Sequence, residues 1–489
     1  MDNSQRAPVD DWPDGPGPGE TAEVEARGRL ARLLDALSIP PGYAVAIRDL
    51  VPHVHRATLA ELWDRDLVPV ILDPHLPGAL RDDLLAELRP AAVVRWTAGE
   101  EAGAAGEGAG AGGAGTDAGG VPPAAVRPCA EQPASRDTWR RFDAPDPDDG
   151  PGAPDPGTPD SGDAVAYVAY TSGSTGRPKG AVIGRRAFDS FVTSTCELYE
   201  LGPQDRRLLL SNPAFDLAME QVGTSLHAGC ALVPAGDGLV ATDPASLAAE
   251  VTRHSITVLS LPTGVFNAVG AAMAADGAAA AAFRDAPVRL VMAGGEAPDR
   301  AAIRGWVRAL PGARLLNGYG PTECTVVTSY GEMTPDGPVT VGRPLPGVTY
   351  ELRDGELIIG GVQVGRGYVH GAAGGFEPGG DRRYATGDGA RMLPDGRWVI
   401  EGRRDRMIKV SGYRVDPAVV EEAVASADGV AAAHAVLVDG ALGCLLVPDA
   451  SAAGDERGAA VMGRVRDRCR AALPRTRCRA CWPSPTPSR

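Results

Sequence analysis

The chain has 489 residues, of which 44% are hydrophobic and 23% charged, and its formal net charge is −15. A chain of this length can divide into about two to four domains, and its negative charge disfavours nucleic acid and anionic membranes as partners. No run of about 18 apolar residues predicts a membrane span, the N-terminus does not resemble a signal peptide, and the eight cysteines are scattered. We therefore expect a cytoplasmic protein with reduced thiols that does not bind membranes.

The N-terminal third is predicted to alternate between helices and strands. Residues 1–22 are expected to be a disordered tail, and leucines at helical spacing predict a helix over 23–38. The apolar strand within "LVPVILDPHLP" (67–77), the helix "RDDLLAELRP" and the strand "AAVVRW" predict a parallel α/β sheet. The low-complexity segment 98–162 predicts a linker or surface excursion that buries no core.

Order is expected to resume with the buried strand "AVAYVAY" (164–170). Strands such as "ITVLSLP" and "VRLVMAGG" alternate with helices over 181–335, and glycine turns predict β-hairpins over 338–401. After Arg404 a strand, "RMIKVSGYRV", a helix and a hairpin predict a compact α+β module.

The run "TSGSTGRPKG" (171–180) follows that buried strand and suits a phosphate cradle, because glycine lets backbone N–H groups approach an anion closely. Lys179 is one of only two lysines in the chain, the other being Lys409, which favours a site that needs a compact ammonium group. The run lacks the Walker pattern, and a flexible polar turn is the alternative interpretation.

"YTSGSTGRPKG" resembles the phosphate loop of the adenylate-forming enzymes, which include nonribosomal peptide synthetase adenylation domains, acyl-CoA and aryl-acid ligases and firefly luciferase. Four further segments resemble this family in the family's order: "NGYGPTECT" (317–325), "GELIIGGVQVGRGYV" (355–369), "YATGD" (384–388) and "GRRDRMIKVSGYRV" (402–415). The closest resemblance is to amino-acid adenylation domains.

The resemblance implies an α/β fold with a large N-terminal region of doubly wound sheets plus a small β-barrel, and a smaller mobile α+β C-terminal domain. The large adenylation domain is expected over 23–404 and the small C-terminal subdomain over 405–475, followed by an atypical tail over 476–489. Asp405 is the implied hinge.

The resemblance also implies ATP and Mg²⁺ as cofactors. Tyr319 is expected to lie against adenine, Thr322 to meet the phosphate, Glu323 to bind the metal and Asp388 to accept hydrogen bonds from the ribose. A Gly-Pro turn with an incidental glutamate and an aspartate that caps its own turn are the alternatives. The implied catalytic residues are Lys179, Thr322, Glu323 and Lys409. Further nucleotide contacts are implied at Thr171, Ser172, Gly173, Ser174, Thr175, Gly176, Gly295, Glu296, Ala297, Asn317 and Arg403.

In amino-acid-activating members the aspartate of a matching "FD" holds the substrate ammonium, and here it is Asp216; capping of the following helix is the alternative. The implied substrate site also contains Leu217, Glu220, Gly264, Val291, Ala293, Gly318, Val326 and Val327. Glu220 is the only charged residue in that set, which favours a long side chain with a polar or cationic end unless Glu220 faces solvent.

The function implied is activation of an amino acid as aminoacyl-AMP, with release of pyrophosphate. The aminoacyl group then passes to the phosphopantetheine thiol of a separate carrier protein, in nonribosomal peptide, antibiotic or related biosynthesis. An acyl- or aryl-CoA ligase and a catalytically weakened nucleotide-binding homologue are the alternatives. The family's C-terminal lysine has no counterpart after "AALPR" (471–475), which predicts a weak first half-reaction.

Overall fold

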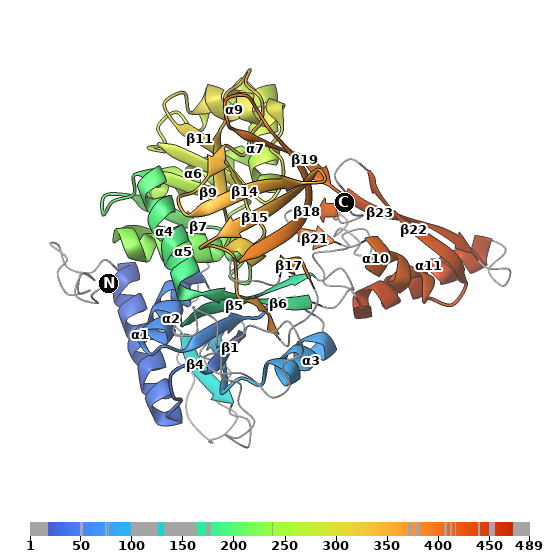
Figure 1. The fold of residues 1–489 in the computed structure, drawn as a ribbon, viewed down its shortest axis with the longest axis horizontal. Coiled ribbons are helices and arrows are strands. Elements are labelled where there is room, and N and C mark those ends of the chain that lie inside the picture. Colours follow the sequence, from blue (N-terminus) through green and yellow to red (C-terminus); the bar gives the residue numbers. More distant parts are fainter. Residues whose placement is uncertain are drawn as a thin grey trace, which may run out of the picture.

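A computed structural model describes residues 18–48, 52–73, 76, 78–98, 126–131, 164–172, 178–236, 238–369, 374–377, 382–404, 408–410, 413–415, 417–438, 441–448 and 455–472. Figure 1 shows a large body with a smaller lobe beside it. The lobe contains α10 (Pro417–Ala425), β22 (Val430–Val438), β23 (Ala441–Pro448) and α11 (Asp455–Ala472). Its helices and hairpin enclose a separate small core, so the α+β module predicted after Arg404 is confirmed.

The first sheet of the large body has seven strands in the order β16-β6-β5-β2-β1-β3-β4. They are β1 (Ala44–Arg48), β2 (Val68–Ile71), β3 (Ala92–Ala98), β4 (Val126–Glu131), β5 (Val165–Ser172), β6 (Pro178–Gly184) and β16 (Gly367–Tyr368). The four inner strands β5, β2, β1 and β3 are parallel, as predicted. Helices α1 (Pro18–Leu37) and α2 (Pro52–Asp64) cover one face, and α3 (Gly78–Leu88) packs on the other.

Two predictions for this region are wrong in part. Helix α1 begins at Pro18 instead of residue 23, because proline's fixed φ suits the first turn of a helix. Within the supposed linker 98–162, Val126–Glu131 forms strand β4, which pairs antiparallel with β3. An edge strand pairs with only one neighbour, so a short segment inside a low-complexity region can form it.

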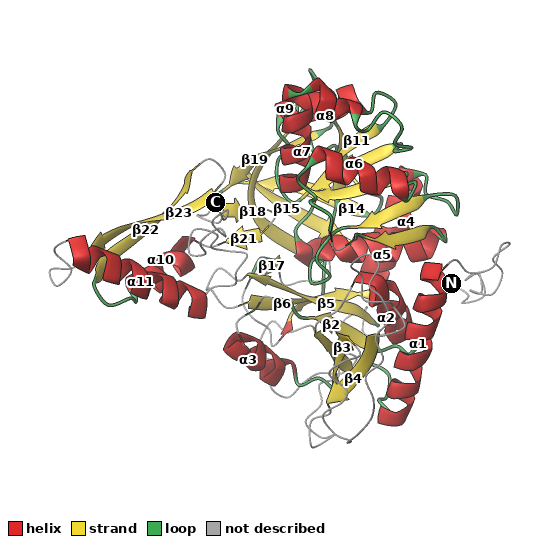
Figure 2. Ribbon diagram, turned by 180° about the vertical axis from the view of Figure 1, so that it is seen from behind, coloured by secondary structure: helices red, strands yellow, loops and turns green. Residues whose placement is uncertain are grey.

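The second sheet has the order β13-β12-β11-β10-β9-β7-β8. Its strands are β7 (Arg206–Leu209), β8 (Ala231–Pro234), β9 (Val258–Pro262), β10 (Leu290–Gly294), β11 (Arg314–Tyr319), β12 (Ser329–Glu332) and β13 (Arg343–Pro344). Helices α4 (Arg185–Tyr199) and α5 (Asp216–Ala228) pack on one face. The other face carries α6 (Pro244–Arg253), α7 (Thr263–Ala275), α8 (Gly277–Ala281) and α9 (Arg300–Ala309), as Figure 2 shows. The predicted doubly wound arrangement is therefore confirmed.

A third, antiparallel sheet contains β14 (Val348–Arg353), β15 (Glu356–Gly361), β17 (Phe376–Glu377), β18 (Arg383–Met392) and β19 (Trp398–Arg403). It forms the small barrel-like part that the resemblance implied. The single strand predicted within "RMIKVSGYRV" is instead two strands, β20 (Ile408–Val410) and β21 (Tyr413–Val415), which pair antiparallel.

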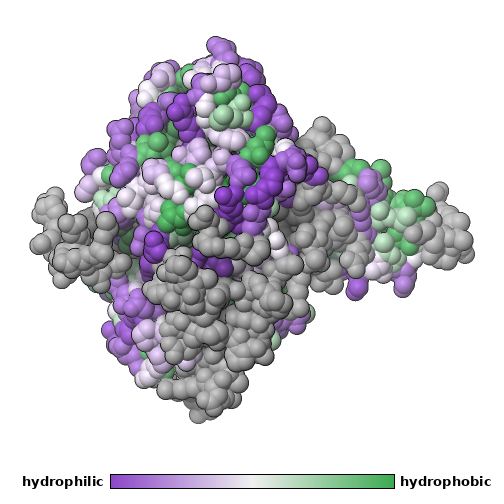
Figure 3. Space-filling model, in the orientation of Figure 1, coloured by the Kyte–Doolittle hydropathy of each residue, from purple (hydrophilic) through white to green (hydrophobic). Residues whose placement is uncertain are grey.

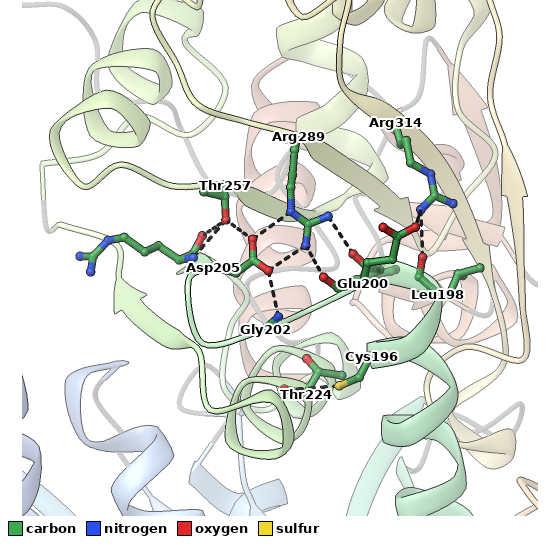
Figure 4. A network of polar contacts seen from close by, with 11 residues as sticks. Cys196, Leu198, Glu200, Gly202, Asp205, Thr224, Thr257, Arg289 and Arg314 are labelled. Atoms are coloured by element: carbon green, nitrogen blue, oxygen red, sulfur yellow. Dashed lines mark hydrogen bonds and ion pairs between the residues drawn. The ribbon is translucent and has the colours of Figure 1, made fainter. Parts of the chain in front are cut away.

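A polar network aligns the amino ends of the second sheet's parallel strands (Figure 4). Asp205, before β7, accepts hydrogen bonds from Thr257 Oγ1 at 2.7 Å and from Arg289 Nη2 at 2.8 Å. Burial alone would raise the pKa of Asp205, but these hydrogen bonds outweigh it and hold that pKa below its usual value. Arg289 also donates to the carbonyl of Tyr199 at 2.8 Å, so the network fixes the end of α4 as well.

Figure 3 shows apolar residues in small groups between polar ones on the large body and on the lobe. The exposed large apolar side chains include Leu445 and Val447 of β23. Within the described residues, no helix combines the length and the apolar character needed to cross a membrane.

His55 of α2 is fully buried, and neither ring nitrogen has a hydrogen-bond partner among the described residues. Burial disfavours the imidazolium and lowers the pKa of His55 to about 3 from its ordinary 6.5. The unfolded state therefore binds the proton more tightly, and the free energy of unfolding should fall as pH drops below about 6.5, by at most ~1.4 kcal/mol per pH unit until about pH 3.

Urea unfolding at pH 7 and pH 5 measures this effect. The wild type should lose about 2 kcal/mol more stability between these pH values than His55→Leu does. His227→Leu, at an exposed position near the end of α5, should keep the wild-type pH dependence. Equal pH dependence of the wild type and His55→Leu would contradict the prediction.

Candidate active site

Several predicted nucleotide residues lie where the parallel strands β9, β10 and β11 end, the edge at which α/β sheets bind ligands. Gly295 follows β10 with a φ of 106°, a conformation that glycine adopts readily. Thr263 Oγ1 donates to the carbonyl of Glu296 at 3.1 Å and so joins the ends of β9 and β10. Asn317 is buried within β11, and its amide donates to the carbonyl of Thr340 at 3.0 Å, so Asn317 braces the sheet.

Tyr319, Asp388 and Arg403 meet where the second and third sheets come together. The Tyr319 hydroxyl donates to Asp388 Oδ2 at 2.5 Å, and Arg403 Nη1 lies 3.2 Å from Asp388 Oδ1. Gly387 beside them has a φ of 72°, and a Cβ there would lie 2.5 Å from Arg403 Nη2. This position therefore requires glycine, which keeps the arginine against the predicted ribose-binding carboxylate.

The predicted phosphate loop connects β5 to β6. Thr171 and Lys179 are paired across this hairpin, and residues 173–177 between them lie outside the described residues. Thr171 Oγ1 donates to Glu323 Oε1 at 3.5 Å, and the Tyr368 hydroxyl donates to the same oxygen at 2.7 Å. Lys179 Nζ lies 5.6 Å from the centroid of the Tyr368 ring. The hairpin, the 3₁₀ turn Thr322–Cys324 and β16 thus converge on one carboxylate.

This group of residues fits the implied metal. Glu323 is 2% exposed and sits among hydroxyl groups, and carboxylate with phosphate oxygens is the donor set that Mg²⁺ prefers. Burial, reinforced by the charge of Glu323, raises the pKa of Tyr368 well above its usual value. The phenol therefore stays protonated and can donate to Glu323, which orients the carboxylate.

Tyr368→Phe keeps the ring beside Lys179 but removes the donor to Glu323. Because a hydrogen bond to a charged group contributes about 1.5 kcal/mol or more, we expect adenylation at limiting Mg²⁺ to slow about tenfold. ATP–pyrophosphate exchange over a Mg²⁺ titration measures this. Tyr350→Phe is the control, because the Tyr350 hydroxyl donates to Ser329 Oγ at 2.8 Å instead. Identical Mg²⁺ curves for the two variants would refute the role of Tyr368.

Asp216 is the first residue of α5, and it does not cap the helix. The residue at the cap is Phe215, which makes no side-chain capping bond. Asp216 Oδ2 instead accepts a hydrogen bond from Thr322 Oγ1. The implied ammonium-binding residue thus touches the residue expected to meet the phosphate. Burial raises the pKa of Tyr167 on β5, and the negative charge of Asp216 raises it further, so the Tyr167 ring lies near Asp216.

Two implied substrate residues on β10 lie on the face of the second sheet opposite to α5. Val291 and Ala293 are fully buried in the core under α7 and α9, away from α5. Their neighbour Met292 faces the side of α5, and a Cβ on Gly318 would lie 3.2 Å from Met292 Sδ. Side chains alternate along a strand, so Met292 and Gly294 of β10 lie on the side of α5. The substrate roles of Val291 and Ala293 stay predictions.

Glu220, the only charged residue among the pocket positions implied beside Asp216, has a charged partner on β7. Glu220 is fully buried, so it does not face solvent, and its Oε1 lies 2.7 Å from Arg207 Nη2. Arg207 lies in "RRLLL", the start of β7. Two adjacent arginines before three leucines do not indicate that one of the arginines points into the core.

The remaining members of the implied site are placed as follows. Leu217 and Gly264 are half-buried, and Gly318, Val326 and Val327 are buried. The side chains of Ser172 and Lys409 and the following residues lie outside what the structure describes: Gly173, Ser174, Thr175, Gly176 and Asp405. Sequence reasoning missed Tyr368 and Arg207. Tyr368 lies in the segment 355–369 that resembles the family, and its place in that segment was the one signal in the sequence that could have indicated it.

The comparisons agree with this geometry. The model of the family "AMP-binding enzyme" matches residues 23–369. The isonitrile lipopeptide synthase of Streptomyces coeruleorubidus is 36% identical over 429 residues, which are 82% of this chain and 26% of that protein. The chain thus spans about a quarter of this relative.

Two solved structures share the fold. The crystal structure of IdnL1 gives a TM-score of 0.70 at 22% identity and covers 96% of this chain and 92% of that one. Holo-PA1221, an NRPS protein with adenylation and PCP domains, gives 0.66 at 21% identity and covers 88% and 72%. The sequence motifs, the doubly wound sheets, the residues gathered at their carboxyl ends and the family match together show that the chain belongs to the AMP-binding family of adenylate-forming enzymes.

Proposed function

We propose that the chain activates an amino acid as aminoacyl-AMP and passes the aminoacyl group to a carrier protein's phosphopantetheine thiol. The observation that carries the proposal is the contact between Asp216 and Thr322. The ammonium and carboxylate of an α-amino acid are attached to the same carbon. A residue that binds the ammonium must therefore lie beside the site where the carboxylate meets ATP, and the contact of Asp216 with Thr322, the proposed phosphate contact, supports that role.

In the first step a carboxylate oxygen of the amino acid attacks the α-phosphorus of ATP, and the bond to pyrophosphate breaks. The catalytic contribution is mainly orientation and neutralisation of developing charge. Asp216 holds the ammonium, Thr322 lies against the phosphate, and Lys179 supplies a cation beside the loop. Mg²⁺, when bound at Glu323, supplies further positive charge at the phosphates.

In the second step the thiol attacks the carbonyl carbon of the aminoacyl-AMP, AMP leaves and a thioester forms. Support for a carrier protein comes from the relatives, which include the adenylation–PCP protein PA1221 and a lipopeptide synthase. Asp405 is the proposed hinge about which the small C-terminal domain rotates between the first and the second step. Lys409 would face the nucleotide only after that rotation.

ATP–pyrophosphate exchange with amino acids and their deamino analogues tests the proposal. Leucine and 4-methylpentanoate, or phenylalanine and 3-phenylpropanoate, differ only in the ammonium that Asp216 would bind. We expect exchange with some amino acids and at least about a hundredfold less with the matched acids. Exchange that prefers aryl or fatty acids, with AMP release dependent on coenzyme A, would favour a CoA ligase. ATP binding without any exchange would favour a catalytically weakened homologue.

A further inference from the structure

A buried ion pair lies between helix α5 and the second sheet. Arg207 of β7 and Glu220 of α5 are 1% and 0% exposed, with Arg207 Nη2 2.7 Å from Glu220 Oε1. Burial raises the pKa of Glu220, while Arg207 opposes that shift. Burial likewise works against charge on Arg207, but Glu220, Cys230 and Tyr199 together outweigh it, and the net shift of the Arg207 pKa is upward. The 2.7 Å contact with the guanidinium makes Glu220 the counter-ion of Arg207, so the pair as a whole has no net charge.

The surrounding hydroxyl groups satisfy most of this pair. Arg207 Nη2 donates to Ser260 Oγ at 2.7 Å, Arg207 Nη1 donates to Thr224 Oγ1, and Ser260 Oγ donates to Glu220 Oε1 at 3.4 Å. Two atoms are exceptions: Glu220 Oε2 and Arg207 Nε are buried and have no hydrogen-bond partner among the described residues. A buried carboxylate oxygen without a donor is unfavourable, and a bound ligand that donates to it would remove the penalty.

The pair lies one helical turn from the candidate ammonium site. Glu220 follows Asp216 by four residues on α5, so the two carboxylates share a face of the helix. Ser260 is paired in register with Met292, which faces the same side of the sheet as Gly318. An amino acid held by Asp216 with its carboxylate at Thr322 would therefore extend its side chain along α5 towards Glu220.

We propose that Arg207 and Glu220 together determine side-chain specificity, and that the substrate is an amino acid whose side chain ends in an uncharged hydrogen-bond donor, a carboxamide or a hydroxyl. This inference rests on the proposed amino-acid activation. The donor satisfies Glu220 Oε2, whereas an apolar end leaves that oxygen unpaired. A cationic end is rejected because Arg207 already balances Glu220, and a second buried cation would repel it.

The first test is exchange by the wild type with glutamine, asparagine and threonine against lysine, ornithine, glutamate and norleucine. The best neutral donor should exceed every charged or apolar member in kcat/KM by at least about tenfold, because a site built to hydrogen-bond a substrate rejects analogues that lack the donor. If lysine or norleucine is best, the specificity inference is wrong while amino-acid activation stands. If no amino acid supports exchange, both fail.

The second test changes the charge balance. Arg207→Met leaves Glu220 as an uncompensated anion, so the ratio of kcat/KM for lysine to that for the best neutral substrate should rise at least about tenfold. Arg206→Met is the matched control, because Arg206 is adjacent on β7 but donates to the carbonyl of His254 at 2.7 Å. An unchanged ratio in a folded Arg207→Met variant would overturn the inference.

A double variant keeps the test decisive if Arg207→Met does not fold. Arg207→Met/Glu220→Met removes both charges, and apolar residues of similar size often replace a buried ion pair without loss of stability. Its preference should move to norleucine by at least about tenfold relative to the neutral donor. Circular dichroism and thermal unfolding establish that each variant is folded. A double variant that keeps the wild-type order of substrates would show that the pair does not contact the side chain.

Discussion

Replacing Asp216 by asparagine should lower amino-acid-dependent ATP–pyrophosphate exchange by about 10²–10³-fold. The substitution keeps the size of the side chain and an oxygen that can accept from Thr322 Oγ1. It removes the negative charge that would pair with the substrate ammonium at the start of α5. Loss of one partner of a desolvated charge pair costs about 2–5 kcal/mol, which corresponds to roughly this fall in kcat/KM.

The Asp216→Asn substitution should weaken binding of the amino acid and leave binding of ATP unchanged. The KM for the amino acid should rise while the affinity for ATP alone stays close to wild type, as measured by calorimetry with a non-hydrolysable analogue. Asp299→Asn is the control, because Asp299 is an exposed aspartate that precedes helix α9 and makes no side-chain capping bond. If Asp216→Asn retained wild-type kcat/KM for every amino acid, the proposed role of Asp216 would be falsified.

Replacing Glu323 by glutamine should slow adenylate formation by about a hundredfold or more. Glutamine preserves the shape of the side chain and can still accept from the Tyr368 hydroxyl, but it lacks the charge that would bind Mg²⁺ at the phosphates. Removal of one preorganised electrostatic contact in an active site typically costs about 10²–10³-fold in kcat.

The concentration of Mg²⁺ for half-maximal exchange should rise in Glu323→Gln as well. Rapid-quench measurement of aminoacyl-AMP over a Mg²⁺ titration separates this effect from a loss of folding. Glu332→Gln is the matched control, because the side chain of Glu332 on β12 is 65% exposed. A Glu323→Gln enzyme with an unchanged rate and an unchanged Mg²⁺ requirement would remove Glu323 from the metal site.

The order of helices and strands in the sheets was largely predictable, because hydrophobic periodicity and glycine turns are local signals. Strand β4 was not predictable from composition. It pairs with β3 at the sheet's edge within a segment whose glycine and proline content argued against a strand. A strand that forms by pairing its backbone with a distant segment need not show hydrophobic periodicity or turn residues in its own sequence.

The candidate site was predictable only where a motif fixes both identity and register. Tyr319 and Asp388 are in contact although they belong to different sheets, and Glu323 lies within reach of Thr171 at the start of the predicted phosphate loop. The face of β10 on which Val291 and Ala293 lie could not be predicted, because the resemblance alone does not determine which side chains of a strand point to which face. Arg207 was missed because nothing in the sequence shows that an arginine on β7 will form an ion pair with a glutamate on α5.

Strand β16 also has a consequence for how the chain folds. It is the outermost strand of the first sheet and pairs with β6, yet the whole second sheet separates the two in sequence. A nascent chain therefore cannot complete its first sheet, or bring Tyr368 to Glu323, until the second sheet has been synthesised. A chain that ended before residue 367 would expose β6 as an open strand edge, where pairing with another molecule leads to aggregation. Synthesis of the β16 segment thus protects the edge and assembles the candidate metal site in the same step.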